Sequence, residues 1–232
     1  MEKVYALKRN LASILFMCGH LHKSLKLHCD ISENLASLRT NHKYQYYLTF
    51  AMATALQGDI KKALQLISKT TEFPDDYKRE KAQYYEYLGW IYNLDEQYQK
   101  AVETLKTGIE LSMKIAPQSA LISQSKRLLA DAYVGLGKFD LAETAAREAL
   151  VVAEKINERV EIAGCYRVFA LLDRKKGNKQ GCREWLKKAC DIYTMIKSRY
   201  ELAVTRYLAA KSGIYDDGER SAMLYLAREY FQ

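Results

Sequence analysis

The 232-residue chain is predicted to be all-α, a solenoid of about six antiparallel helical hairpins, from three features of its sequence. Proline and glycine are scarce, at 2 and 11 residues, which disfavours a turn-rich all-β fold. Apolar residues recur at the three- and four-residue spacing of a helix face. Small residues also return at a nearly constant long interval, which indicates an internal repeat.

The repeat is clearest in a small residue near the start of every second predicted helix. These residues follow one another at intervals of 39, 38, 41, 40 and 40: Ser24, Ala63, Ala101, Ala142, Cys182 and Ala222. The chain is predicted to turn five residues before each of them, at Gly19, Gly58, Glu96, Gly137, Gly177 and Asp217. Glycine at such a point is the usual left-handed end of a helix, so each turn separates the two helices of a hairpin.

A second set of small residues lies seven positions before these turns: Ala12, Ala51, Gly89, Ala130, Ala170 and Ala210. Small side chains on both helices permit the close approach that an antiparallel hairpin requires. Asp59 and Asn178 follow turn glycines and are expected N-caps of the next helix. The predicted helices are 2–18, 21–39, 43–57, 60–72, 76–94, 97–115, 119–136, 139–155, 158–176, 179–196, 199–214 and 218–231. They form repeats at 1–41, 42–74, 75–116, 117–156, 157–197 and 198–232.

Two stretches resemble the tetratricopeptide repeat. One runs from Tyr85 to Tyr92, with Leu88 and Gly89 in its middle, and is followed by Tyr98 and Ala101. The other runs from Leu129 to Tyr133 and is followed by Gly137, Phe139, Ala142 and Ala149. The period near 40 exceeds the usual length of about 34 and is similar to arrays in bacterial signalling regulators, which sit beside ATPase or DNA-binding modules. The resemblance is specific for architecture, a right-handed superhelix of helical hairpins, and not for function.

The charge is uneven along the chain. The formal net charge is +8, with +4 in residues 1–43, −2 in residues 75–117 and +5 in residues 157–198. A nucleic-acid-binding array would use the basic first and fifth repeats, but the acidic third repeat interrupts any continuous track, so nucleic acid is the less favoured partner. No apolar stretch is long enough to cross a bilayer and no export signal is recognised, so no membrane partner is expected. The five cysteines have irregular spacing and are interpreted as free thiols of a cytoplasmic protein.

No phosphate-binding glycine loop and no catalytic motif of a hydrolase or metalloprotease occurs in the sequence. We therefore expect neither an enzyme nor a cofactor. His20, His22 and His28 lie near Cys18 and Cys29, and such a cluster could bind zinc. A packing role for His28, with no metal site, is the favoured interpretation.

The resemblance also implies where a ligand binds, on the first helix of each hairpin at the concave side. The family's contact offsets fall in this sequence on Gln83, Glu86, Tyr87, Trp90, Asn93, Gln124, Arg127, Asp131, Arg167, Arg174, Tyr207 and Lys211. They also reach Arg9, Ser13, Gln45, Thr49, Met52 and Leu171. Arg127 and Arg167 occupy equivalent places in adjacent repeats and could hold a ligand carboxylate. In the alternative, Glu86 and Asp131 neutralise these arginines.

The predicted function is a non-catalytic scaffold that binds a protein or peptide, as the sensory or assembly module of a larger bacterial cytoplasmic regulator of signalling or transcription. The residues at the offsets of the family's clamp for chaperone tails differ too much for that ligand to be expected. A further alternative is self-association. The last helix carries many apolar residues with no capping helix after it, namely Met223, Leu224, Tyr225, Leu226, Tyr230 and Phe231. This end suggests a fragment of a longer protein or a homo-oligomer contact.

Overall fold

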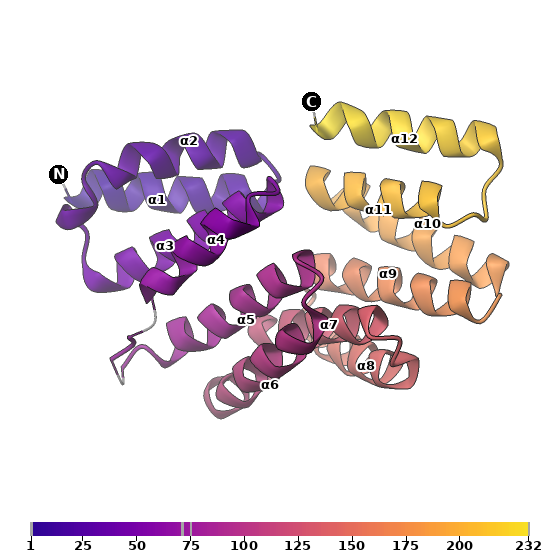
Figure 1. The fold of residues 1–232 in the computed structure, drawn as a ribbon, viewed down its shortest axis with the longest axis horizontal. Helices are drawn as coiled ribbons and strands as arrows, with labels where there is room; N and C mark the ends of the chain where they lie inside the picture. Colours follow the sequence, from indigo (N-terminus) through magenta and orange to yellow (C-terminus); the bar gives the residue numbers. More distant parts are fainter. Residues whose placement is uncertain (1, 71, 75, 232) are drawn as a thin grey trace. The chain divides into compact units, whose positions relative to one another are not determined.

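The computed structural model describes residues 2–70, 72–74 and 76–231, and within these ranges it contains twelve α-helices and no strand. The chain divides into two compact units, Met1–Pro117 (unit 1) and Gln118–Gln232 (unit 2). Figure 1 shows that each unit consists of consecutive helical hairpins. The predicted all-α class is therefore confirmed. Among the described residues, no helix combines the length and apolar character that a bilayer crossing needs.

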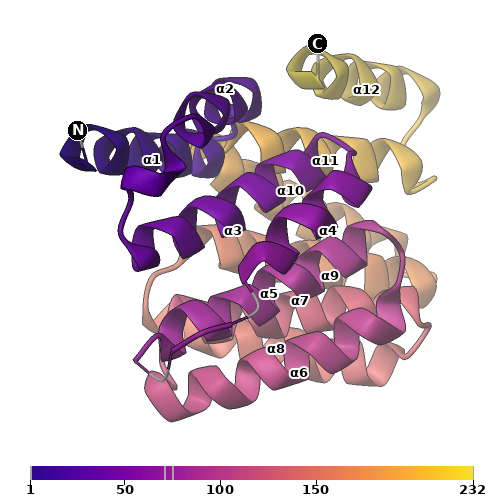
Figure 2. The same cartoon turned by 60° about the vertical axis from the view of Figure 1, so that its left-hand side comes forward.

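Unit 1 holds three hairpins. Their helices are α1 (Glu2–Met17), α2 (Leu21–Ser32), α3 (Thr40–Leu56), α4 (Ile60–Ile67), α5 (Lys78–Leu94) and α6 (Tyr98–Ile115). The two helices of each hairpin pack on each other, and α3 also packs on both α1 and α5. Figures 1 and 2 both show α5 and α6 side by side along most of their length.

Unit 2 repeats the arrangement. Its helices are α7 (Ala120–Gly135), α8 (Phe139–Lys155), α9 (Arg159–Lys175), α10 (Lys179–Met195), α11 (Arg199–Lys211) and α12 (Asp217–Phe231). The first helix of the second hairpin, α9, packs on both α7 and α8, and α11 packs on α10. The first helix of each of the two later hairpins in unit 2 therefore packs on the second helix of the hairpin before it, as in a solenoid.

The small residues and turns behave largely as predicted. Ala12, Ala51, Ala130, Ala170 and Ala210 are all buried, with at most 1% of their surface exposed. The turn residues Gly19, Gly58, Gly137 and Gly177 have φ between 72° and 93°, a region that L side chains rarely adopt. The side chains of Asp59 and Asn178 accept hydrogen bonds from the backbone N–H groups of Lys62 and Gly181, which confirms both N-caps.

The last hairpin differs from the prediction. Its turn lies at Gly213, with φ of 75°, and not at Asp217. The loop between α11 and α12 is longer than the one between α9 and α10, and its Ile214 and Tyr215 are half-buried against the core. The register of α12 consequently moves by one residue, so that Met223, and not Ala222, packs against the core cluster that contains Cys182 and Leu186. Ala222 itself is exposed.

Two helices end earlier than predicted. α2 stops at Ser32 and α4 at Ile67, and short 3₁₀ segments follow at Leu35–Ser37 and Ser68–Thr70. Hydroxyl groups compete for the last carbonyls of both helices: Ser32 donates to the Cys29 carbonyl, and Thr70 donates to the Ile67 carbonyl at 2.7 Å. Such local bonds offer the backbone an alternative to continuing the helix.

Candidate binding site

Buried ion pairs join the first helices of successive hairpins in unit 2. Nε of Arg127, on α7, lies 2.7 Å from a carboxylate oxygen of Glu161, in the first turn of α9. Nη1 of Arg167, on α9, lies 2.6 Å from a carboxylate oxygen of Glu201, in the first turn of α11. We call these two pairs the ion-pair ladder. Since the arginine and the glutamate have the same separation along the sequence in both pairs, the same contact recurs from one repeat to the next.

The ladder is almost completely shielded from water. The Arg127 and Glu161 side chains are 5% and 6% exposed, and those of Arg167 and Glu201 are 11% and 12% exposed. Burial by itself would lower the pKa of Arg127, but the carboxylates of Glu161 and Asp131 outweigh it and raise the pKa well above its ordinary value. The pKa of Arg167 is raised for the same reason, with Glu201 as the main partner. Both guanidinium groups are therefore charged, and each is already paired with a carboxylate of the chain itself.

The surroundings of the ladder are fitted to the arginine side chains. Gly164 on α9 lies against Arg127, where an added Cβ would stand 2.7 Å from Cδ of Arg127. The Arg167 guanidinium lies over the Tyr193 ring, 5.4 Å from its centroid. Burial raises the pKa of the neighbouring Cys165 thiol to about 12, so this thiol stays protonated and unreactive.

Neutral groups form contacts between the hairpins of unit 1. Gln45 on α3 donates to Gln83 on α5 at 2.8 Å, and Gln83 in turn donates to the Tyr87 hydroxyl at 3.2 Å. His28 on α2 lies 2.9 Å from the Thr49 hydroxyl on α3 and stacks on Phe50. Burial lowers the pKa of His28 to about 4. These contacts are structural, and they confirm the packing role of His28.

The similarity to known proteins agrees with this geometry. No protein-family profile matches the chain. The regulatory protein RapK of Bacillus subtilis is 24% identical over 168 residues, which are 70% of this chain and 45% of RapK. A Rap protein solved in complex with competence and sporulation factor has a TM-score of 0.67 at 14% identity, over 99% of this chain and 78% of the other. Apo RapI has a TM-score of 0.56 at 14% identity, over 97% of this chain and 62% of the other. The chain is a tetratricopeptide-like repeat protein related to RapK. It matches less than half of RapK's length.

In this tetratricopeptide-like chain, the ligand-contact positions predicted in unit 1 are largely enclosed. Glu86 and Tyr87 are buried, at 1% and 9% exposure. Gln83, Trp90 and Asn93 are half-buried, and the Trp90 ring packs near those of Tyr87 and Phe16. The expectation that Glu86 and Tyr87 present an open surface is therefore wrong for this structure, because both side chains lie inside the helix packing.

The predicted positions in unit 2 fall into two groups. Arg127 and Arg167 bind carboxylates of the chain itself, and Asp131 contacts Arg127 at 2.8 Å, as the alternative proposed. The accessible group comprises Gln124, half-buried on α7, and the exposed Arg174, Tyr207 and Lys211 on α9 and α11. The Lys211 ammonium lies 5.7 Å from the centroid of the Tyr207 ring.

The sequence reasoning missed Glu161 and Glu201. Their mutual spacing equals that of Arg127 and Arg167, and this repeated acid was the signal that could have revealed the pairing. For a metal, the described residues offer no cluster of three or more histidine, cysteine or acidic side chains.

Proposed function

We propose that the chain binds a protein or peptide, without catalysis, as a regulatory module of a larger bacterial cytoplasmic protein. The observation that carries the proposal is the exposed surface of Arg174, Tyr207 and Lys211, at offsets where tetratricopeptide-like folds contact ligands. Tyrosine and arginine combine a large contact area with directional polar groups and often dominate binding energy. RapK is itself named a regulatory protein, and a Rap protein has been solved with competence and sporulation factor.

In this proposal the ion-pair ladder holds the helices and does not contact the ligand directly. Arg127 and Arg167 fix the positions of α9 and α11 through Glu161 and Glu201. A ligand that prefers one arrangement of these helices shifts the population toward it, and an attached module can respond to that shift.

The test is affinity capture from a bacterial cytosolic lysate, followed by calorimetry with each purified captured polypeptide. The informative variant is Tyr207→Ala with Lys211→Glu, and the matched control is Tyr225→Ala with Lys187→Glu, which changes exposed residues elsewhere in unit 2. We expect a polypeptide that binds the wild type and the control and loses at least tenfold in affinity for the variant. Equal capture by all three proteins would refute the proposed surface. Retention of nucleic acid that elutes with salt would favour the nucleic-acid alternative.

A further inference from the structure

A pocket of about 400 Å³ lies within unit 1, where α2 meets α3 and α4. Such a volume is within the range of small-molecule sites. The pocket is lined by His22, Leu25, Lys26, Cys29, Phe50, Thr54, Gln57, Asp59 and Lys62. Because the first hairpin forms one wall and the second hairpin forms the other, the pocket belongs to a junction inside the array and not to an end of it.

Positive charge predominates in this pocket. Lys26 and Lys62 are exposed, and no carboxylate pairs with either ammonium group in the part of the chain that the structure describes. The Lys62 ammonium lies 5.8 Å from the centroid of the Phe50 ring. Asp59 also lines the pocket, but its carboxylate caps α4, where it accepts a hydrogen bond from the Lys62 backbone N–H at 3.1 Å. The pocket therefore has two ammonium groups that are free to bind an anion.

The corresponding junction in unit 2 lies between α8 and α9, three repeats further along the chain. Counted from the small residues that define the repeat, the correspondences are Leu25 with Glu143, Cys29 with Arg147, Phe50 with Phe169 and Gln57 with Lys176. In unit 2 the Arg147 guanidinium lies 5.6 Å from the centroid of the Phe169 ring. The Glu143 carboxylate binds both Arg147, at 2.7 Å, and Lys176, at 2.8 Å. A carboxylate that holds two cations thus lies beside the ring.

The junction in unit 1 keeps the ring and two cations but lacks the acid. Cys29 is much smaller than Arg147, and this difference leaves space for the pocket. Leu25 places an apolar group where Glu143 supplies the carboxylate. The group that would complete the arrangement is therefore a carboxylate, and the apolar wall beside it favours one attached to an apolar body.

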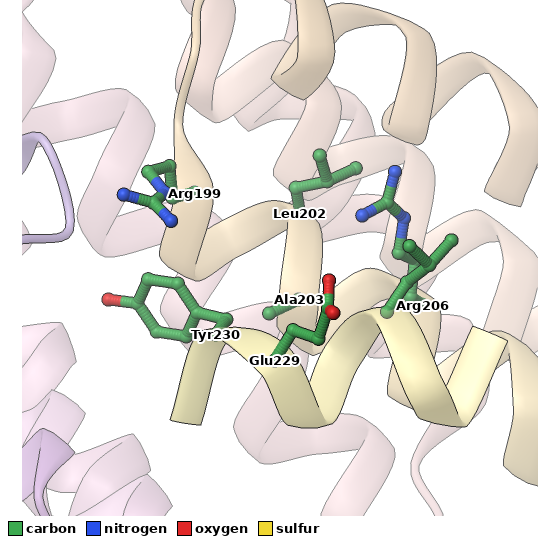
Figure 3. A pocket seen from close by; sticks show the side chains of 7 residues that line it. Arg199, Leu202, Ala203, Arg206, Glu229 and Tyr230 are labelled. Carbon is green, nitrogen blue, oxygen red and sulfur yellow. The ribbon is translucent and has the colours of Figure 1, made fainter. Parts of the chain in front are cut away.

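A pocket of about 420 Å³ in unit 2 provides a contrast. It lies between α11 and α12 and contains the cationic side chains of Arg199 and Arg206. Figure 3 shows Glu229 of α12 in the same pocket, so the chain itself provides a carboxylate there. Of these two pockets, the one in unit 1 is the one that lacks a carboxylate for its cations.

We propose that the pocket in unit 1 binds a small aromatic carboxylate. The ammonium groups of Lys26 and Lys62 hold the carboxylate, and the aromatic body packs against Leu25 and Phe50. The pocket shares no residue with the exposed surface to which a protein or peptide ligand is assigned above, and its occupation does not depend on that function.

The test uses 2-naphthoate as the probe and the exposed thiol of Cys29, in the pocket wall, as the reporter. Mass spectrometry measures the rate at which iodoacetamide alkylates this thiol with and without 2-naphthoate. Cys18 is also exposed but does not line the pocket, so it serves as the internal control. We expect saturating 2-naphthoate to slow alkylation of Cys29 at least fivefold and to leave Cys18 unchanged. Half of the effect should be reached at or below about 1 mM, the weak end of specific affinities.

Three variants of the whole chain locate the binding. Lys26→Gln/Lys62→Gln should lose the protection of Cys29. The matched control Lys23→Gln/Lys61→Gln changes the net charge equally at exposed residues of the same helices, outside the pocket, and should be protected as the wild type is. Leu25→Glu supplies the missing carboxylate from the chain itself and should also abolish the protection. Circular dichroism verifies that every variant is folded.

Three results would overturn the proposal. The first is unchanged alkylation of Cys29 in the wild type at about 10 mM 2-naphthoate, well above the weak end of specific affinities. The second is equal protection by the uncharged alcohol 2-naphthalenemethanol. The third is an equal loss of protection in Lys23→Gln/Lys61→Gln and in Lys26→Gln/Lys62→Gln. Since the first two results are obtained with the unaltered chain, the proposal remains testable if a variant does not fold.

Discussion

In unit 2 the first helices of successive hairpins are bridged by buried guanidinium–carboxylate pairs, whereas in unit 1 an amide pair joins α3 to α5, and a histidine that bonds a hydroxyl group and stacks on a ring joins α2 to α3. The hairpins themselves are alike, with the same small residues buried at the same places. The comparison teaches that the close approach of the helices sets the fold, while the chemistry at the junctions can vary. That chemistry determines how each unit responds to the loss of one partner or to a change in pH.

The largest loss of stability is expected when one partner of an ion pair in the ladder is removed. Glu161→Leu leaves the buried Arg127 with Asp131 alone, and removal of one partner of a buried pair costs about 3 kcal/mol or more in the free energy of unfolding. Urea denaturation measures the loss, and hydrogen exchange should place it in unit 2. The double variant Arg127→Met/Glu161→Leu should regain most of the stability. As a control, Lys176→Ala removes an exposed, solvent-screened pair with Glu143 and should change the free energy of unfolding far less. If Glu161→Leu lowers the free energy of unfolding as little as Lys176→Ala does, the buried pair does not stabilise the fold.

The next effect concerns unit 1 and pH. The pKa of His28 is about 4 in the folded chain, against an ordinary value of 6.5, because burial disfavours the charged ring. Between these values the unfolded chain binds a proton that the folded chain does not, so stability is full above about pH 6.5 and falls as the pH drops toward 4. From pH 7 to pH 4.5 the wild type should lose about 2 kcal/mol more than His28→Gln. Equal losses in urea denaturation at the two pH values would contradict a buried neutral histidine.

A third test compares close packing with junction chemistry. At Gly89 of α5 an added Cβ would stand 2.5 Å from Cγ of Leu105, so Gly89→Ala should destabilise the chain by about 2 kcal/mol through overpacking. Gly108→Ala, whose Cβ would meet Tyr85 Cβ at 3.1 Å, serves as the milder case and should cost less. If Gly108→Ala lowers the melting temperature more than Gly89→Ala does, the close approach of α5 and α6 is not what excludes a side chain at residue 89.

The smallest loss of stability is expected on removal of a helix N-cap, and it should be equal in the two units. Asp59→Ala and Asn178→Ala each remove a side chain that accepts a hydrogen bond at a helix start, and each should cost about 1 kcal/mol. Urea denaturation of both variants provides the comparison. A clearly larger loss at one cap would indicate that the hairpins of the two units are less alike than their geometry suggests.

Much of the fold was predictable because it depends on local patterns. Turn glycines, small residues and N-caps act within one hairpin, and their spacing gives the helix boundaries in most repeats. The exceptions have local causes that spacing does not carry. The hydroxyl bonds of Ser32 and Thr70 shorten α2 and α4, and the longer loop at Gly213 moves the register of α12.

The candidate site was less predictable, since it depends on which residues share a junction. Family offsets identify a helix face but not its burial, so Glu86 and Tyr87 are enclosed while Tyr207 is exposed. The role of Arg127 follows only when Glu161, which belongs to the next hairpin, is brought to its side. Pairing of this kind is decided by the stacking of hairpins and not by any single repeat.

The ion pairs of the ladder also distinguish the hairpin before α9 from the hairpin after it. The α9 helix carries both halves of the contact: Glu161 receives Arg127 from the hairpin before it, and Arg167 reaches Glu201 in the hairpin after it. A second copy of residues 159–198 inserted directly after the first would therefore bring its own Glu161 to the preceding Arg167 and offer its own Arg167 to Glu201. The α9/α10 hairpin is in this sense a module that can be joined to itself head to tail, and the array could be lengthened one repeat at a time without leaving a charge buried alone.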